Sequence, residues 1–180
     1  MTDHAQTLLD RRYVLVALAS TLAACRPGQS EFMPAVTLAP VAGLTSRSGQ
    51  PLPGVATEAQ GSRLLVVNFW GTWCPTCQSE HQALMALSND PRIKLVGVAI
   101  RDTERAVAHY LAQRGNPYEA VSIDHDRTLA GAAGLRGVPT KALVSADRRI
   151  ITTLVGPANS EGVQAQLSAV IKQAMQQPVG

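Results

Sequence analysis

The stretch Asn68–Gln82 reads NFWGTWCPTCQSEHQ and contains Cys74 and Cys77, two of the three cysteines in the chain. It begins inside Leu64–Trp70 (LLVVNFW), an apolar run of strand length. The residues after the cysteines have the spacing of one helix face, which predicts a helix from Cys74 to Leu87 with its apolar side at Ala83, Leu84 and Leu87. Pro75 then falls in the first helical turn, where its missing N–H costs nothing. The stretch therefore predicts a strand that leads directly into a helix beginning at a Cys-x-x-Cys pair.

The remainder of the chain predicts an α/β fold. Ile93–Ile100 (IKLVGVAI) is a second apolar run, typical of a strand that is covered on both faces. Further elements are expected, in order, as a helix capped by Asp102, a strand at Glu119–Ile123, a helix at Arg127–Ala133, strands at Lys141–Ser145 and Arg149–Val155, and a helix capped by Ser160. This order, βαβ, then an inserted αβ unit, then αββα, predicts a central mixed sheet flanked by helices. Functional loops are expected at the carboxyl ends of its strands.

The N-terminal part has a different composition, and we expect three regions. Residues 1–24 resemble an export signal, because Arg11-Arg12 precedes an uncharged run, Tyr13–Ala24, that is shorter than the ~20 residues of a membrane-spanning helix. Leu22–Cys25 (LAAC) resembles a bacterial lipobox, which implies a lipid on Cys25. An uncleaved anchor or an unrelated buried helix is the alternative. Residues 25–60, rich in Pro, Gly, Ser and Thr, are expected to form a tether and a weak hairpin, and residues 61–180 the folded domain.

Composition limits the function classes. The 180 residues are 46% hydrophobic, enough for one core of ordinary size. The 16 basic and 13 acidic residues are scattered and aromatic residues make up only 4%, so the chain has little of the basic, aromatic surface that nucleic-acid binding needs. We therefore expect a small globular protein without a nucleic-acid partner.

The position of the cysteines favours redox chemistry. The free N–H groups at a helix N-terminus stabilise a thiolate, and in such motifs a cysteine pKa falls from about 8.5 to roughly 3.5–7.5. Cys74 is thus expected to attack a disulfide and Cys77 to resolve the mixed disulfide. Pro75 and Thr76, between the two, are expected to tune the pair. A metal site that uses the cysteines with His81 is the alternative, although the chain offers few further ligands, and a purely structural disulfide is another.

A resemblance to a family supports the redox interpretation. FWGTWCPTC after an apolar strand, together with Gly137–Thr140 (GVPT) before a later strand, resembles the thioredoxin superfamily and implies a thioredoxin-like fold. The resemblance implies that Pro139 is cis and faces the dithiol, and that the backbone of Val138 pairs with an extended partner segment. Thr140 and Trp73 are expected at the same substrate-binding surface, where Trp73 shields the dithiol or is simply half-buried packing.

A narrower resemblance covers residues 64–157. WCPTCQSEHQALMAL, GNPYEAVSID, GLRGVPT and LVGP are similar to the membrane-tethered, TlpA-like reductases of cytochrome c maturation, the DsbE/CcmG type. That similarity implies a periplasmic enzyme whose redox-active disulfide is its only redox group. A transmembrane thiol reductase would donate electrons, and apocytochrome c or a haem-ligation protein would receive them.

Two positions that are usually acidic in that family bear on the direction of electron flow. Glu80 matches a family glutamate, although it has an equally good interpretation as a solvated helix residue. Thr140 stands where the family usually has a second glutamate. Carboxylates near a thiolate disfavour its charge, so this difference leaves open a general periplasmic reductase or an oxidant of the metal-stress type. A copper- or haem-carrying lipoprotein is the alternative from another class.

Overall fold

The computed structural model describes residues 31–46, 49–57, 63–174 and 176. Its strands are β1 (Leu64–Trp70), β2 (Ile93–Ile100), β3 (Ala120–Asp124), β4 (Thr140–Val144) and β5 (Ile150–Val155); its helices are α1 (Pro75–Ser79), α2 (His81–Leu87), α3 (Glu104–Arg114), α4 (Thr128–Ala132) and α5 (Glu161–Ala174). Within these ranges, no helix has both the length and the apolar character needed to cross a bilayer. The expected export signal and Cys25 lie outside the described residues.

The strands form one mixed sheet in the order β3-β2-β1-β4-β5. β1 pairs in parallel with β2, and β2 with β3, while β4 runs antiparallel to both β1 and β5. The predicted order of elements and the mixed, thioredoxin-like sheet are thus confirmed. Every residue of β1 is buried, which agrees with its nearly continuous apolar sequence and its position at the centre of the sheet.

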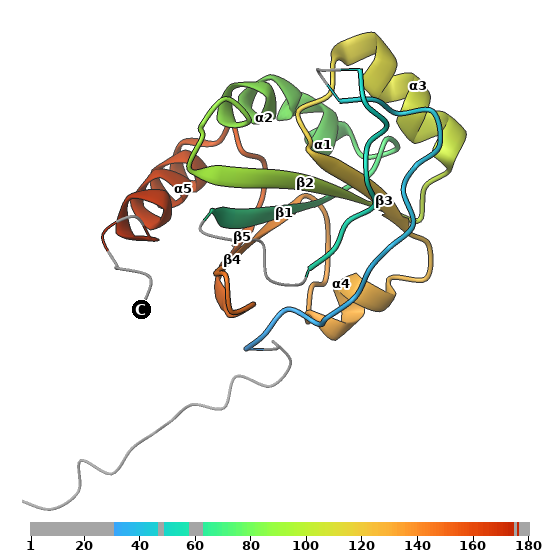
Figure 1. Cartoon of the computed structure of the whole chain (residues 1–180). Helices are drawn as coiled ribbons and strands as arrows, with labels where there is room; N and C mark the ends of the chain where they lie inside the picture. Colours follow the sequence, from blue (N-terminus) through green and yellow to red (C-terminus); the bar gives the residue numbers. More distant parts are fainter. Residues whose placement is uncertain (1–30, 47–48, 58–62, 175, 177–180) are drawn as a thin grey trace, which may run out of the picture.

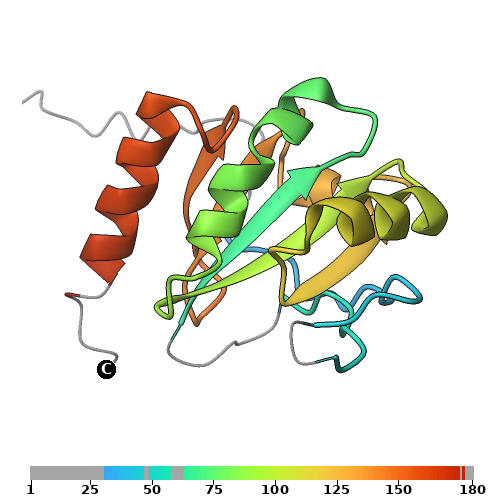
Figure 2. The same cartoon turned by 90° about the horizontal axis from the view of Figure 1, so that it is seen from above.

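Helices cover both faces of the sheet (Figures 1 and 2). One apolar cluster joins the β1 and β2 side chains of one face to α2, α3 and α5, through Leu84, Val107 and Leu167. A second cluster lies on the opposite face, where α4 packs through Leu129 and Ala130. The dithiol belongs to the first cluster, so the redox pair lies at the edge of the core rather than on a detached loop.

The N-terminal extension, residues 31–46 and 49–57, begins beside the start of β5, where Glu31 accepts from Ile150 N–H, and continues to the outer edge of β3 (Figure 1). Isolated antiparallel bridges at Thr37–Ala56 and Thr45–Pro51 form the weak hairpin that the sequence predicts. Val121 of β3 accepts a hydrogen bond from Val41 N–H and donates one to the Pro53 carbonyl. An uncovered strand edge invites pairing with other chains, and this contact satisfies part of that edge.

The helix after the dithiol differs from the prediction. A single helix was expected from Cys74 to Leu87, whereas the structure has α1 and α2 separated at Glu80. The Glu80 side chain is fully buried and contacts Lys141 of β4. The break in the helix therefore accompanies a long-range contact, which the spacing of apolar residues could not predict.

The packing of the extension can be tested with two matched valines. Val55 is fully buried in the extension, whereas Val155 on the edge strand β5 is 77% exposed. We expect Val55→Ala to lower the free energy of unfolding by about 2 kcal/mol, since it removes two buried methyl groups and leaves a cavity. Val155→Ala should change it by less than about 0.5 kcal/mol. Urea denaturation measures both, and equal effects would show that the extension does not stabilise the domain.

Candidate active site

A short loop between β1 and α1 positions the dithiol, and Asp102 anchors that loop. The Asp102 carboxylate accepts hydrogen bonds from Thr72 N–H at 2.6 Å and from Thr72 Oγ1 at 3.0 Å. Gln78 Nε2 of α1 donates to the Thr72 carbonyl at 2.7 Å. The expectation that Asp102 caps α3 was wrong, because Thr103 Oγ1 accepts from Ala106 N–H and performs that role. Asp102 instead ties the end of β2 to the loop in front of the cysteines.

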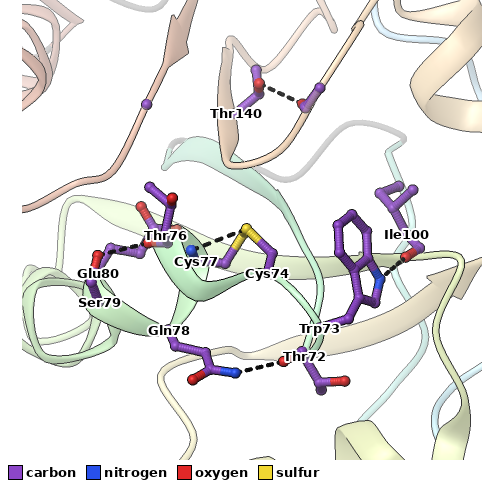
Figure 3. Close-up of a disulfide and its surroundings, with 12 residues drawn as sticks. Thr72, Trp73, Cys74, Thr76, Cys77, Gln78, Ser79, Glu80, Ile100 and Thr140 are labelled. Carbon is purple, nitrogen blue, oxygen red and sulfur yellow. Dashed lines mark hydrogen bonds between the residues drawn. A yellow bond between two sulfur atoms is a disulfide. The ribbon is translucent and has the colours of Figure 1, made fainter.

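Cys74 and Cys77 form a disulfide at the start of α1, with their Cα atoms 5.2 Å apart (Figure 3). Cys74 is the N-cap residue, and its Sγ accepts a hydrogen bond from Cys77 N–H at 3.2 Å. Both residues are buried to a similar degree, so exposure does not distinguish an attacking from a resolving cysteine. The N–H directed at Cys74 does distinguish them, because in the reduced protein it would stabilise negative charge on that sulfur. Pro75 and Thr76 are both exposed beside the pair.

The loop before β4 lies at the same edge of the sheet. Phe69 near the end of β1 pairs with Thr140 at the start of β4, so the residues after β1 and before β4 are neighbours. The Val138–Pro139 bond is cis, as the resemblance implies. Within the described part of the chain, neither the N–H nor the C=O of Val138 forms a hydrogen bond. Thr140 is buried and its Oγ1 donates to the Gly137 carbonyl at 2.8 Å, which closes the turn (Figure 3).

A buried ion pair lies behind the dithiol. Lys141 Nζ on β4 contacts Glu80 Oε2 at the α1–α2 junction, and neither side chain is exposed. Lys141 also donates to the Gly156 carbonyl at 2.9 Å, and Glu80 accepts from Ala158 N–H at 2.7 Å. Burial lowers the pKa of Lys141, while the charge of Glu80 and its hydrogen bond to Lys141 oppose that shift. The solvated alternative for Glu80 was therefore wrong, and Lys141 is a site residue that the sequence analysis missed.

Trp73 is 55% exposed, so it does not bury the dithiol by itself. Its indole Nε1 donates to the Ile100 carbonyl at 3.0 Å, which holds the ring over the end of β2 (Figure 3). Gly71 leaves room for this ring, since a Cβ at that position would approach Trp73 Nε1 to 2.6 Å. Trp73 is thus a fixed, partly exposed wall beside Cys74.

His81 is a packing residue in this structure. It is buried, its Nε2 lies 3.1 Å from the Arg114 carbonyl, and its ring meets Tyr110 edge to face. Burial lowers the pKa of His81, which favours the neutral ring. Among the residues that the structure describes, no three His, Cys, Asp or Glu side chains are grouped in a way that could hold a metal ion.

The ion pair can be tested with matched Lys→Met variants. We expect Lys141→Met to lower the free energy of unfolding by about 3–5 kcal/mol at pH 7, because it leaves the Glu80 carboxylate buried without its partner. The double variant Glu80→Gln/Lys141→Met should recover part of that loss. Lys172 is exposed on α5, and Lys172→Met should cost no more than about 0.5 kcal/mol. If Lys141→Met and Lys172→Met had equal effects in urea denaturation, the pair would not be a structural constraint.

Comparisons with known proteins agree with this site. The Redoxin family model matches residues 29–171. The thiol:disulfide interchange protein CycY of Rhizobium leguminosarum is 32% identical over 128 residues, which cover 71% of this chain and 69% of CycY. HelX of Rhodobacter capsulatus, another thiol:disulfide interchange protein, is 29% identical and covers 77% of this chain and 74% of its own length.

A solved structure shows the same fold. The secreted Mycobacterium tuberculosis disulfide oxidoreductase described as homologous to Escherichia coli DsbE superposes with a TM-score of 0.58 at 21% identity, covering 77% of this chain and 96% of that one. The family match spans the sheet, the dithiol and the cis-proline loop. The chain therefore belongs to the Redoxin family, and it is a thiol–disulfide oxidoreductase.

Proposed function

We propose that this protein is a periplasmic, membrane-anchored reductant in which Cys74 attacks the substrate disulfide and Cys77 releases the product. The observation that carries the assignment of the two roles is the Cys77 N–H directed at Cys74 Sγ. That donor favours negative charge on Cys74 in the reduced protein, and the thiolate is the form that attacks.

The reaction proceeds by two exchanges. The Cys74 thiolate attacks one sulfur of a substrate disulfide, which forms a mixed disulfide and releases the other substrate sulfur as a thiolate that takes up a proton. Cys77, once deprotonated, attacks Cys74, which closes the Cys74–Cys77 disulfide and frees the second substrate thiol. Two electrons pass to the substrate, and a thiol reductase must return them before the next turnover.

The substrate segment binds in extended form against the cis-proline loop. Val138 offers one backbone N–H and one C=O that form no hydrogen bond within the described part of the chain, and its side chain is half-buried. These groups suit the addition of a short strand from a partner. Pro139 and Thr140 hold the loop, since the Pro139 carbonyl accepts from Gly156 N–H at 3.0 Å and Thr140 bonds to Gly137. Trp73 forms the other side of this binding surface.

The cellular role follows from the resemblance to the DsbE/CcmG type. By that resemblance a transmembrane thiol reductase donates the electrons, and the cysteines of apocytochrome c or of a haem-ligation protein receive them. The names of the relatives, which are thiol:disulfide interchange proteins, support this assignment. A lipid on Cys25, or an uncleaved N-terminal segment, would keep the protein at the membrane, with residues 25–60 as tether and extension and residues 61–180 as the catalytic domain.

The roles of the cysteines can be tested by trapping. Cys77→Ala should accumulate mixed disulfides through Cys74, because no second thiol is left to release the partner. Cys74→Ala is the matched control and should trap at least tenfold less. Non-reducing gels of the periplasmic and membrane fractions, with identification of the trapped protein, provide the measurement. Trapping through Cys77 instead, or metal retained by the wild type and lost in Cys77→Ala, would contradict the proposal.

The direction of electron flow can be tested by the reduction potential. A reductant should have a potential for the Cys74–Cys77 pair below about −180 mV, the region of protein disulfide isomerase and more reducing proteins. Equilibration of the full chain with glutathione and dithiothreitol buffers measures it. A value near −120 mV, as in strong disulfide donors, would instead support the oxidant that the absence of a glutamate at position 140 leaves open.

A further inference from the structure

A pocket lies beside Trp73, the residue before Cys74, at the carboxyl ends of β1 and β2. Its volume is about 210 Å³. Its wall includes Trp73 and Val138, the latter from the cis-proline loop, and the apolar lining continues through Phe69, Ile100, Ala130 and Leu135. A substrate segment that lies along the cis-proline loop would therefore pass its side chains over this pocket.

Three arginines, Arg101, Arg127 and Arg136, complete the lining, and no Asp or Glu is part of it. Arg127 Nη2 donates to the Leu135 carbonyl at 2.7 Å, which holds this guanidinium against the loop. Arg101 and Arg136 are exposed. Among the described residues, none of the three forms an ion pair. Three cations thus gather at one apolar hollow without a carboxylate partner from the described part of the chain.

The neighbouring carboxylates Asp102 and Asp124 do not form ion pairs with the arginines. Asp102 is buried and accepts from Thr72 and from Thr103 N–H, as part of the loop anchor. Asp124 is buried and accepts from Ala130 N–H at the start of α4. Both carboxylates are held by donors of their own, so the guanidinium groups remain available to an incoming anion.

We propose that this pocket receives a carboxylate side chain of the substrate polypeptide, an Asp or Glu within about three residues of the cysteine that Cys74 attacks. This inference rests on the proposed function, because it assumes a polypeptide disulfide as the substrate. An extended segment advances ~3.3 Å per residue, so a carboxylate two or three residues from the cysteine lies ~7–10 Å from the reacting sulfur. The apolar lining contacts the methylene groups of the side chain, while the arginines bind its oxygens. The substrates are thereby sorted by an acidic residue beside the disulfide.

The test compares three peptides with one intramolecular disulfide and neutral flanks, which carry Glu, Gln or Lys at one position. The position is placed two residues before the first cysteine in one set and two residues after it in another. We mix the fully reduced chain with each peptide and follow formation of the Cys74–Cys77 disulfide by tryptophan fluorescence. In at least one set, the second-order rate constant for Glu should exceed that for Gln by about tenfold, the size of a charge-assisted hydrogen bond. The Lys peptide should react more slowly than Gln, and added salt should reduce the difference.

A variant locates the preference in the pocket. In Arg101→Gln/Arg136→Gln the Glu-to-Gln ratio should fall toward one. Arg105 is exposed on α3 outside the pocket lining, so Arg105→Gln is the matched control and should keep the wild-type ratio. Equal rates for Glu and Gln in both sets would overturn the inference, as would a preference that the double variant retains.

The same peptides separate this inference from the proposed direction of electron flow. If the reduced chain transfers no electrons to any peptide, the oxidised chain is mixed with the dithiol forms, and the Glu-to-Gln ratio is measured in reverse. A Glu preference in that direction would support the pocket and overturn the reductant. Equal rates in reverse would overturn both. The wild-type ratio and its salt dependence need no variant, so poor folding of the double variant would not prevent a decision.

Discussion

The buried contact between Glu80 and Lys141 is the constraint around which the site is organised. A charge that is moved into a protein core must be paired and hydrogen-bonded, so either of these two charges would destabilise the fold without the other. The pair joins the α1–α2 junction to β4, and its further hydrogen bonds reach residues 156–158 before α5. The helix that carries the dithiol is therefore held to the strand that begins immediately after the cis-proline. Loss of either charge would make the position of Cys74 relative to the substrate-binding loop less fixed.

The same pair changes the electrostatic argument about the dithiol. A lone carboxylate near the cysteines would disfavour a thiolate and thus favour the disulfide, which makes a protein a better reductant. Here the carboxylate of Glu80 has a lysine directly against it, and position 140 contributes a hydroxyl that is already bonded to Gly137. The acidic influence on the sulfurs is therefore weaker than Glu80 alone implies. For this reason the reduction potential, and not the motif, must decide between reductant and oxidant.

The fold was predictable because the patterns that define its central strands and first helix lie within short stretches of sequence. β1 and β2 are apolar except for Asn68 and Lys94, and the Cys-x-x-Cys pair with Pro75 marks where the following helix begins. The break at Glu80, the role of Asp102 and the presence of Lys141 were not predictable in the same way. Asp102 and Thr103 are adjacent residues that can both cap a helix, and only the position of Thr72 distinguishes them. Lys141 is separated from Glu80 by 61 positions in sequence, so no local period could connect them.

The charged groups around the dithiol are thus arranged in two ways. Behind the cysteines, opposite charges are buried and paired, which stabilises one geometry but presents no charge to a partner. Beside Trp73, Arg101 and Arg136 are exposed at a pocket with an apolar floor. In the free protein they are solvated, so they destabilise the fold little. Their attraction to a carboxylate is strongest when the carboxylate enters the pocket and displaces water. The redox potential of the dithiol and the choice of substrate disulfide can therefore be changed independently. The paired charges can influence the potential of the two sulfurs, whereas the unpaired ones can influence which disulfide is presented to them.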